Sequence, residues 1–418
     1  MSLNHVISAF TKKSDIFQLY SKCPVQWDMA QQGFTYTSWK KDKRVLLWHI
    51  YCFVTIDTCY MAGVIYFIAK LLCKIGRPVS DLTKIVISLL SGLFNFYGFV
   101  MHVMVSKHGV GGAYGWNGCR KVEERIMIWS WGHCDIYGPY SQHTKSGDSV
   151  LQNIIISSVL KLLDIYPIIV TASVISLHLD PLYFAVVDLS DFFQLSHRAH
   201  FTLHFLRFFI IAGNTVMICS TLKMVLISFM SRLKIQLNIF SLLLKHAKII
   251  LSQRIRFVPR IEFLVKIHLS LQIAGQQVAP FQELGTIALM LVGQLIFVFS
   301  NFATLRFYNV LPLAAYQFYP SVSIVVGTIV SLTLPVAQKL AEDSKEVLRI
   351  LDASVVVGGS NGRLIALKRK IRSTQPHKLN AAFGGVKLFL NRETKREYFQ
   401  TGINNTINLL LGVEGTAG

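Results

Sequence analysis

Polar residues recur at helical spacing near the C-terminal end of the chain, in the otherwise apolar stretch TGINNTINLLLGV (residues 401–413). Thr401, Asn405, Asn408 and Gly412 stand at i, i+4, i+7 and i+11, so on an α-helix they share one face. Asparagine carbonyls offer neutral oxygens to a passing ion, and asparagine side chains also hydrogen-bond to neighbouring helices. Either way the stripe needs water or a partner, because unpaired amides in hydrocarbon cost several kcal/mol each.

Two interpretations of this stripe remain open from the residues alone. In the first, it lines a water-filled path that Leu409 to Leu411 close by dewetting. In the second, it holds helices together, with asparagine hydrogen bonds worth about 0.6 to 2 kcal/mol and a glycine that permits close approach. The candidate pore-lining residues are Thr401, Asn405, Asn408, Leu411 and Gly412.

The composition is that of a membrane protein. Hydrophobic residues make up 52% of the 418 residues and charged residues only 15%, against roughly 25% charged in an average soluble protein. The formal net charge of +20 would fit a nucleic-acid-binding protein if the basic residues clustered on a soluble domain. They stand between apolar runs instead, so we expect a lipid bilayer as partner and no nucleic acid.

Seven apolar runs are candidates for crossing a membrane, which takes about 20 residues. The seventh is the shortest candidate, because NRETKRE at residues 391–397 interrupts it and leaves about 16 residues for the bilayer. The predicted runs are Val45–Ala69, Ile85–Ser106, Val150–Leu177, Leu203–Met230, Thr286–Arg306, Gln317–Val336 and Ala381–Val413.

Lysine and arginine collect in the N-terminal segment and in the loops after the second, fourth and sixth runs. Cytoplasmic loops carry this excess, so we predict a cytoplasmic N-terminus and, after seven crossings, an extracellular C-terminus. The first run acts as the insertion signal, since the residues before it are polar. The predicted fold is an all-α integral membrane domain with a cytoplasmic helical anchor. Its parts are a cytoplasmic N-terminal segment (1–44), helices one to six (45–338), an anchor helix and linker (339–380), and the seventh segment with its tail (381–418).

Signals of enzymatic chemistry are weak. The stretch GVGGAYGWNG (residues 109–118) resembles a dinucleotide turn, but no strand precedes it, and we expect a flexible connection there. Cys119 and Cys134, with His108 and His133 nearby, lack the spacing of a metal site. We therefore expect no catalytic residues, no metal, no cofactor and no enzymatic activity.

The C-terminal residues resemble a known family. The stretches TLPVAQKLAEDSKEVLRILD (residues 333–352) and HKLNAAFGGVKLFLNRETKREYFQTGINNTINLLLGV (residues 377–413) are similar to the C-terminal signature of arthropod gustatory receptors, in the superfamily that includes insect odorant receptors. That signature is a long cytoplasmic helix, a small-residue and aromatic entry, a turn and a final helix. The family's Thr-Tyr and Gln-Phe pairs are absent, since Asn405, Thr406, Gly412 and Val413 stand there, so the resemblance implies a divergent member.

This resemblance implies a function. Such receptors are ligand-gated nonselective cation channels of the plasma membrane that assemble as tetramers, and the final helix of each subunit lines the pore. A small-molecule tastant would open the channel, as a homotetramer or with related subunits. The alternatives are a secondary transporter, for which inverted repeats are missing, and a G-protein-coupled receptor, whose orientation is the opposite.

A chemosensory pocket is expected to be concave and aromatic and to open toward the outside. With the predicted orientation, the outer halves of the second to sixth runs supply its residues. The candidate ligand-binding residues are Phe94, Tyr166, Phe208, Asn214, Phe299, Asn301, Phe302 and Tyr319.

Ionisable residues inside the predicted runs are costly and need partners. Lys161 and Asp164 are three residues apart, so we expect an ion pair between them, whereas Arg207 and Lys223 are expected to extend toward the membrane surfaces. On the cytoplasmic side, IFSLLLKHAKIILSQRI (residues 239–255) has helical periodicity. We expect it to pack against the anchor helix and the LNAAFGGVKLFL segment, forming contacts between subunits.

Overall fold

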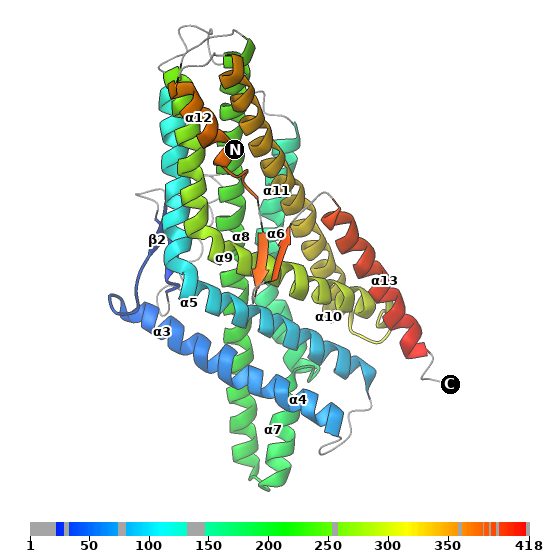
Figure 1. Cartoon of the computed structure of the whole chain (residues 1–418). Coiled ribbons are helices and arrows are strands. Elements are labelled where there is room, and N and C mark those ends of the chain that lie inside the picture. The colour runs from blue at the N-terminus through cyan, green and yellow to red at the C-terminus, as the bar shows by residue number, and fades with distance from the viewer. Residues whose placement is uncertain are drawn as a thin grey trace.

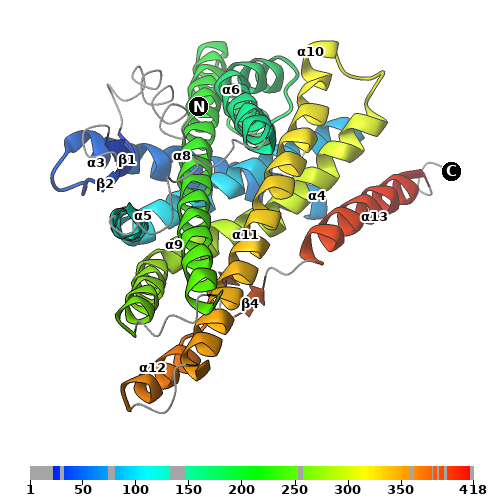
Figure 2. The same cartoon turned by 90° about the horizontal axis from the view of Figure 1, so that it is seen from above.

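The computed structural model describes residues 22–28, 33–73, 81–131, 147–252, 258–357, 362–378, 380–383, 386–389 and 393–414. Long helices dominate it, and α8 runs nearly the whole length of the molecule (Figures 1 and 2). The helices are α3 (Lys43–Cys52), the π-helical η1 (Phe53–Tyr60), α4 (Met61–Cys73), α5 (Leu82–Trp131), α6 (Gly147–Ser176), α7 (Pro181–Phe192), α8 (His197–Ser252), α9 (Val258–Arg306), α10 (Leu313–Tyr316), α11 (Phe318–Val357), α12 (Gly362–Ser373) and α13 (Thr394–Glu414).

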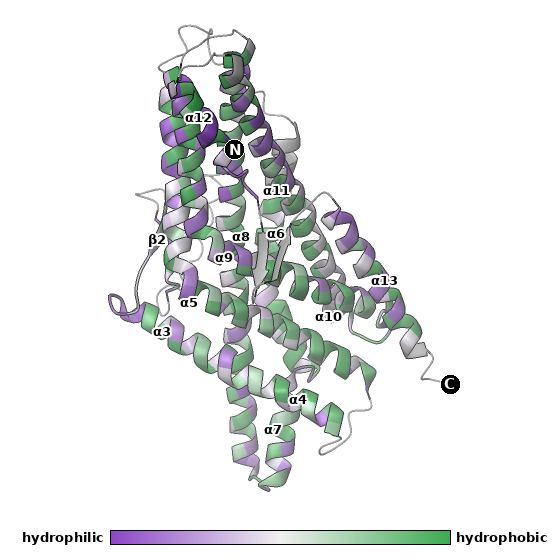
Figure 3. Ribbon diagram, in the orientation of Figure 1, coloured by the Kyte–Doolittle hydropathy of each residue, from purple (hydrophilic) through white to green (hydrophobic). Residues whose placement is uncertain are grey.

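Six stretches among the described residues are long and apolar enough to cross a membrane, and they overlap the first six predicted runs. Helix α13 is not among them, because hydrophilic residues alternate with apolar ones along it (Figure 3). The count of seven crossings and the orientation of the termini therefore stay predictions. The six stretches are Lys43–Cys73, Leu82–Ser130, Ile154–Phe192, His197–Ser252, Val258–Arg306 and Phe318–Val355.

The glycine-rich stretch at residues 109–118 lies inside α5, so the expectation of a flexible connection was wrong. A Cβ atom added at Gly111 would lie 2.7 Å from the carbonyl oxygen of Gln277, and one at Gly115 would lie 2.7 Å from that of Ala274. Both carbonyls belong to α9. The glycines therefore allow α5 and α9 to approach backbone to backbone, as small residues do between membrane helices.

Two antiparallel β-hairpins interrupt the helical architecture, so the prediction of a purely helical fold was wrong in this respect. Strand β1 (Val25–Asp28) pairs with β2 (Gly33–Tyr36), and β3 (Asn380–Phe383) pairs with β4 (Val386–Phe389). The second hairpin occupies the first half of the predicted seventh run. The sequence has a Gly-Gly dipeptide between two short apolar runs there, which is a hairpin signal.

The first hairpin is attached to α5 through aromatic packing and one amide. Trp27, Phe34 and Trp116 contact one another edge to face, with ring centroids 5.1 to 5.2 Å apart. The Asn117 side chain donates to the Phe34 carbonyl (2.7 Å) and accepts from the Phe34 amide (3.1 Å). Both backbone groups of Phe34 are thereby satisfied, which fixes the hairpin against the helix.

The segments predicted to form the anchor pack around α11 within the single chain, while their cytoplasmic position and their contacts between subunits stay predictions. Helix α8, which contains residues 239–252, lies against α11, and β3 lies against α9. The Ser344 hydroxyl of α11 accepts from the backbone amide of His377 at 2.8 Å, and it lies 3.2 Å from Nε2 of His268 on α9. Ser344 thus joins α9, α11 and the segment that precedes β3.

The ion pairs differ from those expected. Asp164 pairs with Lys223 of α8 rather than with Lys161, which is exposed. Arg207 does not extend to the membrane surface but lies buried against Asp180. Spacing along one helix cannot reveal these pairs, because the partner in each comes from another helix.

Candidate ligand cavity and pore helix

A cavity of about 120 Å³ lies in the half of the bundle that the sequence places toward the outside. An engineered cavity of about 150 Å³ takes up benzene, so this one suits a molecule with a single small ring. Residues of η1, α5, α6, α8, α9, α10 and α11 enclose it, and most are apolar or aromatic.

Aromatic rings from three helices meet in this cavity. The Phe318 ring of α11 lies 5.5 Å from the Tyr166 ring of α6 and 6.0 Å from the Phe94 ring of α5, measured between centroids. Tyr319, the next residue of α11, is only 4% exposed. Such ring edges and faces favour aromatic guests.

Two asparagines contribute amides to the polar part of the wall. Nδ2 of Asn214 donates to Oδ1 of Asn95 at 2.7 Å, and Nδ2 of Asn95 donates to the Ile56 carbonyl at 3.3 Å. Oδ1 of Asn214 is buried and has no hydrogen-bond partner among the described residues. The hydroxyl of Tyr166, in the same wall, is also buried without a hydrogen-bond partner among those residues. An apolar cavity with these two unused polar atoms fits a small ligand that carries a hydroxyl or amine donor.

Four of the eight candidate ligand residues line this cavity: Phe94, Tyr166, Asn214 and Tyr319. The other four lie elsewhere. Phe208 is 43% exposed, Phe299 is half-buried against the core, Phe302 is fully buried beside Phe307, and Asn301 accepts a 2.7 Å hydrogen bond from Ser323.

The depth of these residues in the bundle was predictable, but the side of the helix that faces the cavity was not. Sequence reasoning also missed Tyr60, Asn95 and Phe318, all of which line it. Asn95 carried a usable signal, because an amide inside a predicted membrane run needs a partner. Phe318 stands next to Tyr319 in the sequence, but an aromatic residue in an apolar run gives no comparable signal.

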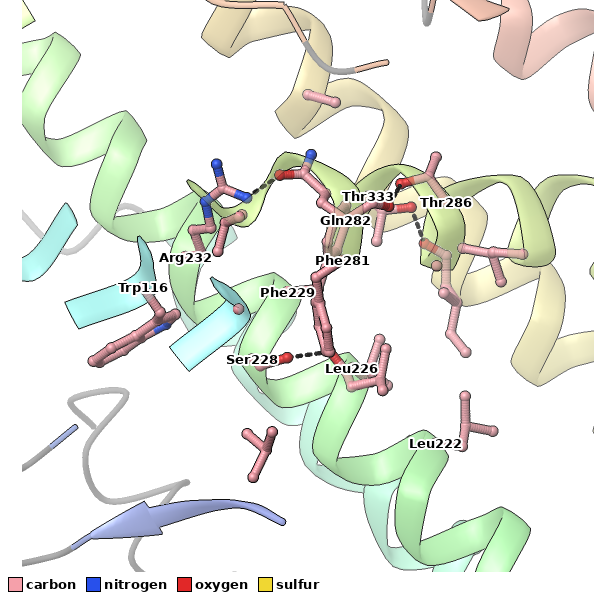
Figure 4. Close-up of a pocket in the computed structure, with 18 of the residues that line it drawn as sticks. Trp116, Leu222, Leu226, Ser228, Phe229, Arg232, Phe281, Gln282, Thr286 and Thr333 are labelled. Carbon is pink, nitrogen blue, oxygen red and sulfur yellow. Dashed lines mark hydrogen bonds between the residues drawn. The ribbon is translucent and has the colours of Figure 1, made fainter. Parts of the chain in front are cut away.

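A second cavity of about 70 Å³ follows the first toward the side that the sequence predicts to be cytoplasmic. Tyr97, Leu222, Leu289 and Ile329 belong to both walls. Figure 4 shows Leu222 at one end of the second cavity, Phe229 and Phe281 in its middle, and Arg232 with Gln282 at the other end. A series of small voids therefore runs from the aromatic cavity to a buried guanidinium.

Helix α13 attaches to the bundle by one face. Tyr398, Gly402 and Thr406 on that face are buried. A Cβ atom at Gly402 would lie 2.9 Å from the Phe297 ring, and Nε2 of Gln294 donates to the Tyr398 carbonyl at 3.1 Å. Glycine at 402 thus lets α13 lie close to α9.

The remaining faces of α13 are uncovered in the single chain. The candidate pore residues Thr401, Asn405, Asn408, Leu411 and Gly412 are all exposed. An apolar row is exposed as well, with Ile403 at 53%, Ile407 at 47% and Leu411 at 62%. The polar stripe lies about a quarter of a turn from the attached face. The exposed polar stripe can therefore face water, and the exposed apolar row can face lipid or another subunit.

One helix separates the aromatic cavity from α13. Gly293 and Ile296 of α9 line the cavity, while Gln294 and Phe297 contact α13. A Cβ atom at Gly293 would lie 3.5 Å from Oη of Tyr398. A molecule that displaces α9 from within the cavity would therefore displace Tyr398 too.

No protein-family model matches the chain, and no curated protein matches it in sequence. Its fold is nevertheless similar to solved structures. The insect olfactory receptor OR5 from Machilis hrabei in complex with eugenol superposes with a TM-score of 0.61 at 11% identity, over 98% of this chain and 99% of the receptor. The same receptor in a second structure gives 0.60 with the same identity and coverage. The chain therefore has the fold of an insect olfactory receptor along nearly its whole length.

Proposed function

We propose that this protein is a chemosensory, ligand-gated, nonselective cation channel of the plasma membrane. A small molecule, of the tastant or volatile class, would bind in the aromatic cavity. Four subunits, identical or related, would place their α13 helices around a pore. The resemblance of the C-terminal residues to gustatory receptors and the olfactory-receptor fold both favour this function.

The aromatic cavity is the observation that carries the proposal. Aromatic rings from three helices line it, Asn214 and Tyr166 supply polar atoms without partners, and it adjoins the helix that α13 lies against. OR5 was solved in complex with eugenol, a molecule with one aromatic ring and a hydroxyl, and a ligand of that kind suits these groups.

A ligand would open the channel only if it binds the open conformation more tightly than the closed one, since the shift between the two is limited by that difference in affinity. A guest wedged between Phe318 and Ile296 would move α9, and through Phe297 and Tyr398 it would move α13. The stripe of Asn405 and Asn408 would then turn relative to the pore axis. The apolar row at Leu411 would leave or enter the constriction.

Current recording tests the proposal directly. The chain would be expressed alone and with related receptor subunits, and membrane current measured against a panel of aromatic alcohols, sugars, bitter compounds and volatiles. A ligand-dependent cation current without G-protein signalling supports the channel. Substrate uptake without channel-sized current would favour a secondary transporter, and a response that requires G-protein activation would favour a G-protein-coupled receptor.

A further inference from the structure

A polar cavity of about 500 Å³ adjoins the second cavity on its cytoplasmic side. Among the described residues, the two walls have only Arg232 and Gln282 in common. The predicted fourth membrane run ends at Met230, so this chamber lies where the sequence places the inner membrane surface. Helices α8, α9 and α11 and residues 375–378 form its wall.

Arg232 is a buried cation without a buried counter-charge. It is 7% exposed. Its polar neighbours are the side-chain oxygen Oε1 of Gln282, which accepts from Nη1, and the Cys119 thiol, and both are neutral. Its Nε atom has no hydrogen-bond partner among the described residues, and no carboxylate of those residues forms a salt bridge with it. Buried guanidinium groups are normally paired with an anion, and the described residues supply none here.

His377 meets Arg232 at the same point of the wall. A Cβ atom at Gly275 would lie 3.3 Å from Cε1 of His377 and 3.7 Å from Nη2 of Arg232. The two side chains therefore lie side by side against the backbone at Gly275, where no side chain comes between them. The Nε2 atom of His377 has no partner among the described residues, while its backbone amide is held by Ser344. The ring is fixed in place by Phe240 and His268, whose centroids lie 5.3 and 5.5 Å away.

The rest of the wall suits hydroxyl groups. Five glutamines contribute amides that both donate and accept, and the Glu283 carboxylate accepts from hydroxyls. Lys378 adds a second cation at the chamber's edge. Few purely hydrophobic side chains take part. The glutamines are Gln236, Gln272, Gln276, Gln282 and Gln375.

We propose that this chamber binds a phosphorylated polyol, with a phosphate between Arg232 and His377 and the hydroxyls on the glutamine amides. Guanidinium and phosphate form paired charge-assisted hydrogen bonds. The ligand is either a soluble inositol phosphate or the headgroup of an inositol lipid in the inner leaflet. Both present phosphates and hydroxyls on a ring, and both can reach a chamber at the inner membrane surface.

The bound molecule would act on the segment that leads to the pore helix. Residues 375–378 stand between α12 and the β3–β4 hairpin, and α13 follows the hairpin. A phosphate shared by Arg232 of α8 and His377 would tie that segment to the bundle. The chamber is thus a second, regulatory site at the opposite end of the series of voids from the aromatic cavity.

Adjacent glutamines provide a matched pair of variants. Gln276 and Gln277 are both exposed on α9, but only Gln276 lines the chamber. Gln276→Glu adds a negative charge to the wall, and Gln277→Glu adds the same charge beside it. Arg232→Gln removes the buried cation, with Arg349→Gln at an exposed site of α11 as its control.

Binding would be measured on the purified full chain, so that the result does not depend on current. Inositol hexakisphosphate is titrated in detergent, and native mass spectrometry counts inositol bisphosphate lipid retained from lipid nanodiscs. We expect saturable binding in one arm, weakened about tenfold or more by each variant. Gln276→Glu adds a negative charge that repels the phosphate, and Arg232→Gln removes the charge-assisted hydrogen bonds to it.

The two controls, Gln277→Glu and Arg349→Gln, should bind as the original chain does. Binding in the first arm identifies a soluble phosphate as the ligand, and binding in the second arm identifies a lipid. Equal affinities of the Gln276→Glu and Gln277→Glu variants would overturn the proposal, as would the absence of binding in both arms. Should Arg232→Gln fail to fold, the exposed glutamine pair still decides the question.

Discussion

The side-chain amides of Asn95 and Asn214 form a 2.7 Å hydrogen bond in the wall of the aromatic cavity, although the two residues stand 119 positions apart. This bond uses one of the two N–H donors of Asn214 and leaves its oxygen for a guest. It also joins α5 to α8 at the depth where a ligand would bind.

Asn214→Leu should weaken the response to ligands that carry a hydroxyl. The change removes the free acceptor, and a lost hydrogen bond costs about 0.5 to 1.5 kcal/mol, which raises the half-maximal concentration by roughly two- to tenfold. Thr215→Val is the control, because Thr215 lines the same cavity but bonds to its own helix. Dose–response currents measure both. An unchanged response of Asn214→Leu would exclude the asparagine from ligand binding.

Val170→Phe should abolish the ligand response without harming assembly. Val170 lines the cavity, and the added ring would occupy a large part of its 120 Å³. Ile168→Phe on the same helix is the matched control, since Ile168 is 73% exposed. Surface expression and ligand-evoked current are compared. Full activity of Val170→Phe would mean that the ligand binds elsewhere.

Asn408→Leu should favour the closed channel. In the proposed tetramer, the exposed stripe would then carry an apolar ring around the pore, and apolar constrictions close by dewetting. Single-channel recording gives conductance and open probability, and native-size analysis gives the oligomer. The neighbouring Ile407→Leu, on the apolar row, serves as control. Normal conductance with a disrupted oligomer would instead assign the stripe to helix packing.

Arg207→Met should destabilise the protein by about 3 to 5 kcal/mol, because it leaves the Asp180 carboxylate buried and unpaired. Asp180 is fully buried, accepts from Nε of Arg207 at 3.0 and 3.1 Å, and caps α7 through the Tyr183 amide. Adding Asp180→Asn should recover part of the loss, since asparagine also caps helices. Thermal unfolding in detergent measures the series, with the exposed Arg198→Met as control. Equal melting temperatures of Arg207→Met and Arg198→Met would contradict this role.

The pH dependence of stability should change in His377→Gln. Burial, with help from His268 and Arg232, lowers the pKa of His377 from 6.5 to about 3. The unfolded chain therefore takes up a proton below about pH 6.5 that the folded chain refuses, and stability falls as the pH decreases through this window. At about pH 5.5 the loss is about 1.4 kcal/mol.

His377→Gln should remove that loss. Thermal unfolding at about pH 7.5 and about pH 5.5 measures it, and His197→Gln at an exposed site is the control. If all three proteins lose the same stability between the two pH values, His377 is not the responsible group.

The membrane crossings were predictable because apolar length is a property of contiguous residues. The six stretches from Lys43 to Val355 follow directly from it. The polar stripe on α13 was predictable for the same reason, since 3.6-residue periodicity is local. By contrast, the pairing of Asp164 with Lys223 and of Arg207 with Asp180 depends on which helices become neighbours.

Two local features were misjudged for different physical reasons. Glycines usually disfavour helices, but at Gly111 and Gly115 the close contact with α9 outweighs their backbone entropy. The seventh apolar run was taken as one element, although the Gly-Gly pair inside it marks a hairpin. Hydropathy indicated how deep in the bundle a residue lies, but not toward which neighbour its side chain points. Tyr319, which lines the aromatic cavity, therefore could not be distinguished from Phe302, which does not.

The attachment of α13 by a single face bears on the order of events during synthesis. The six apolar stretches precede α13 in the chain, so they are synthesised before it. Its mixture of polar and apolar residues makes it a poor substrate for independent insertion. It must therefore be recruited by the finished bundle, through Tyr398, Gly402 and Thr406. In the proposed tetramer, a subunit that has not yet assembled would expose this loosely attached helix to cellular quality control.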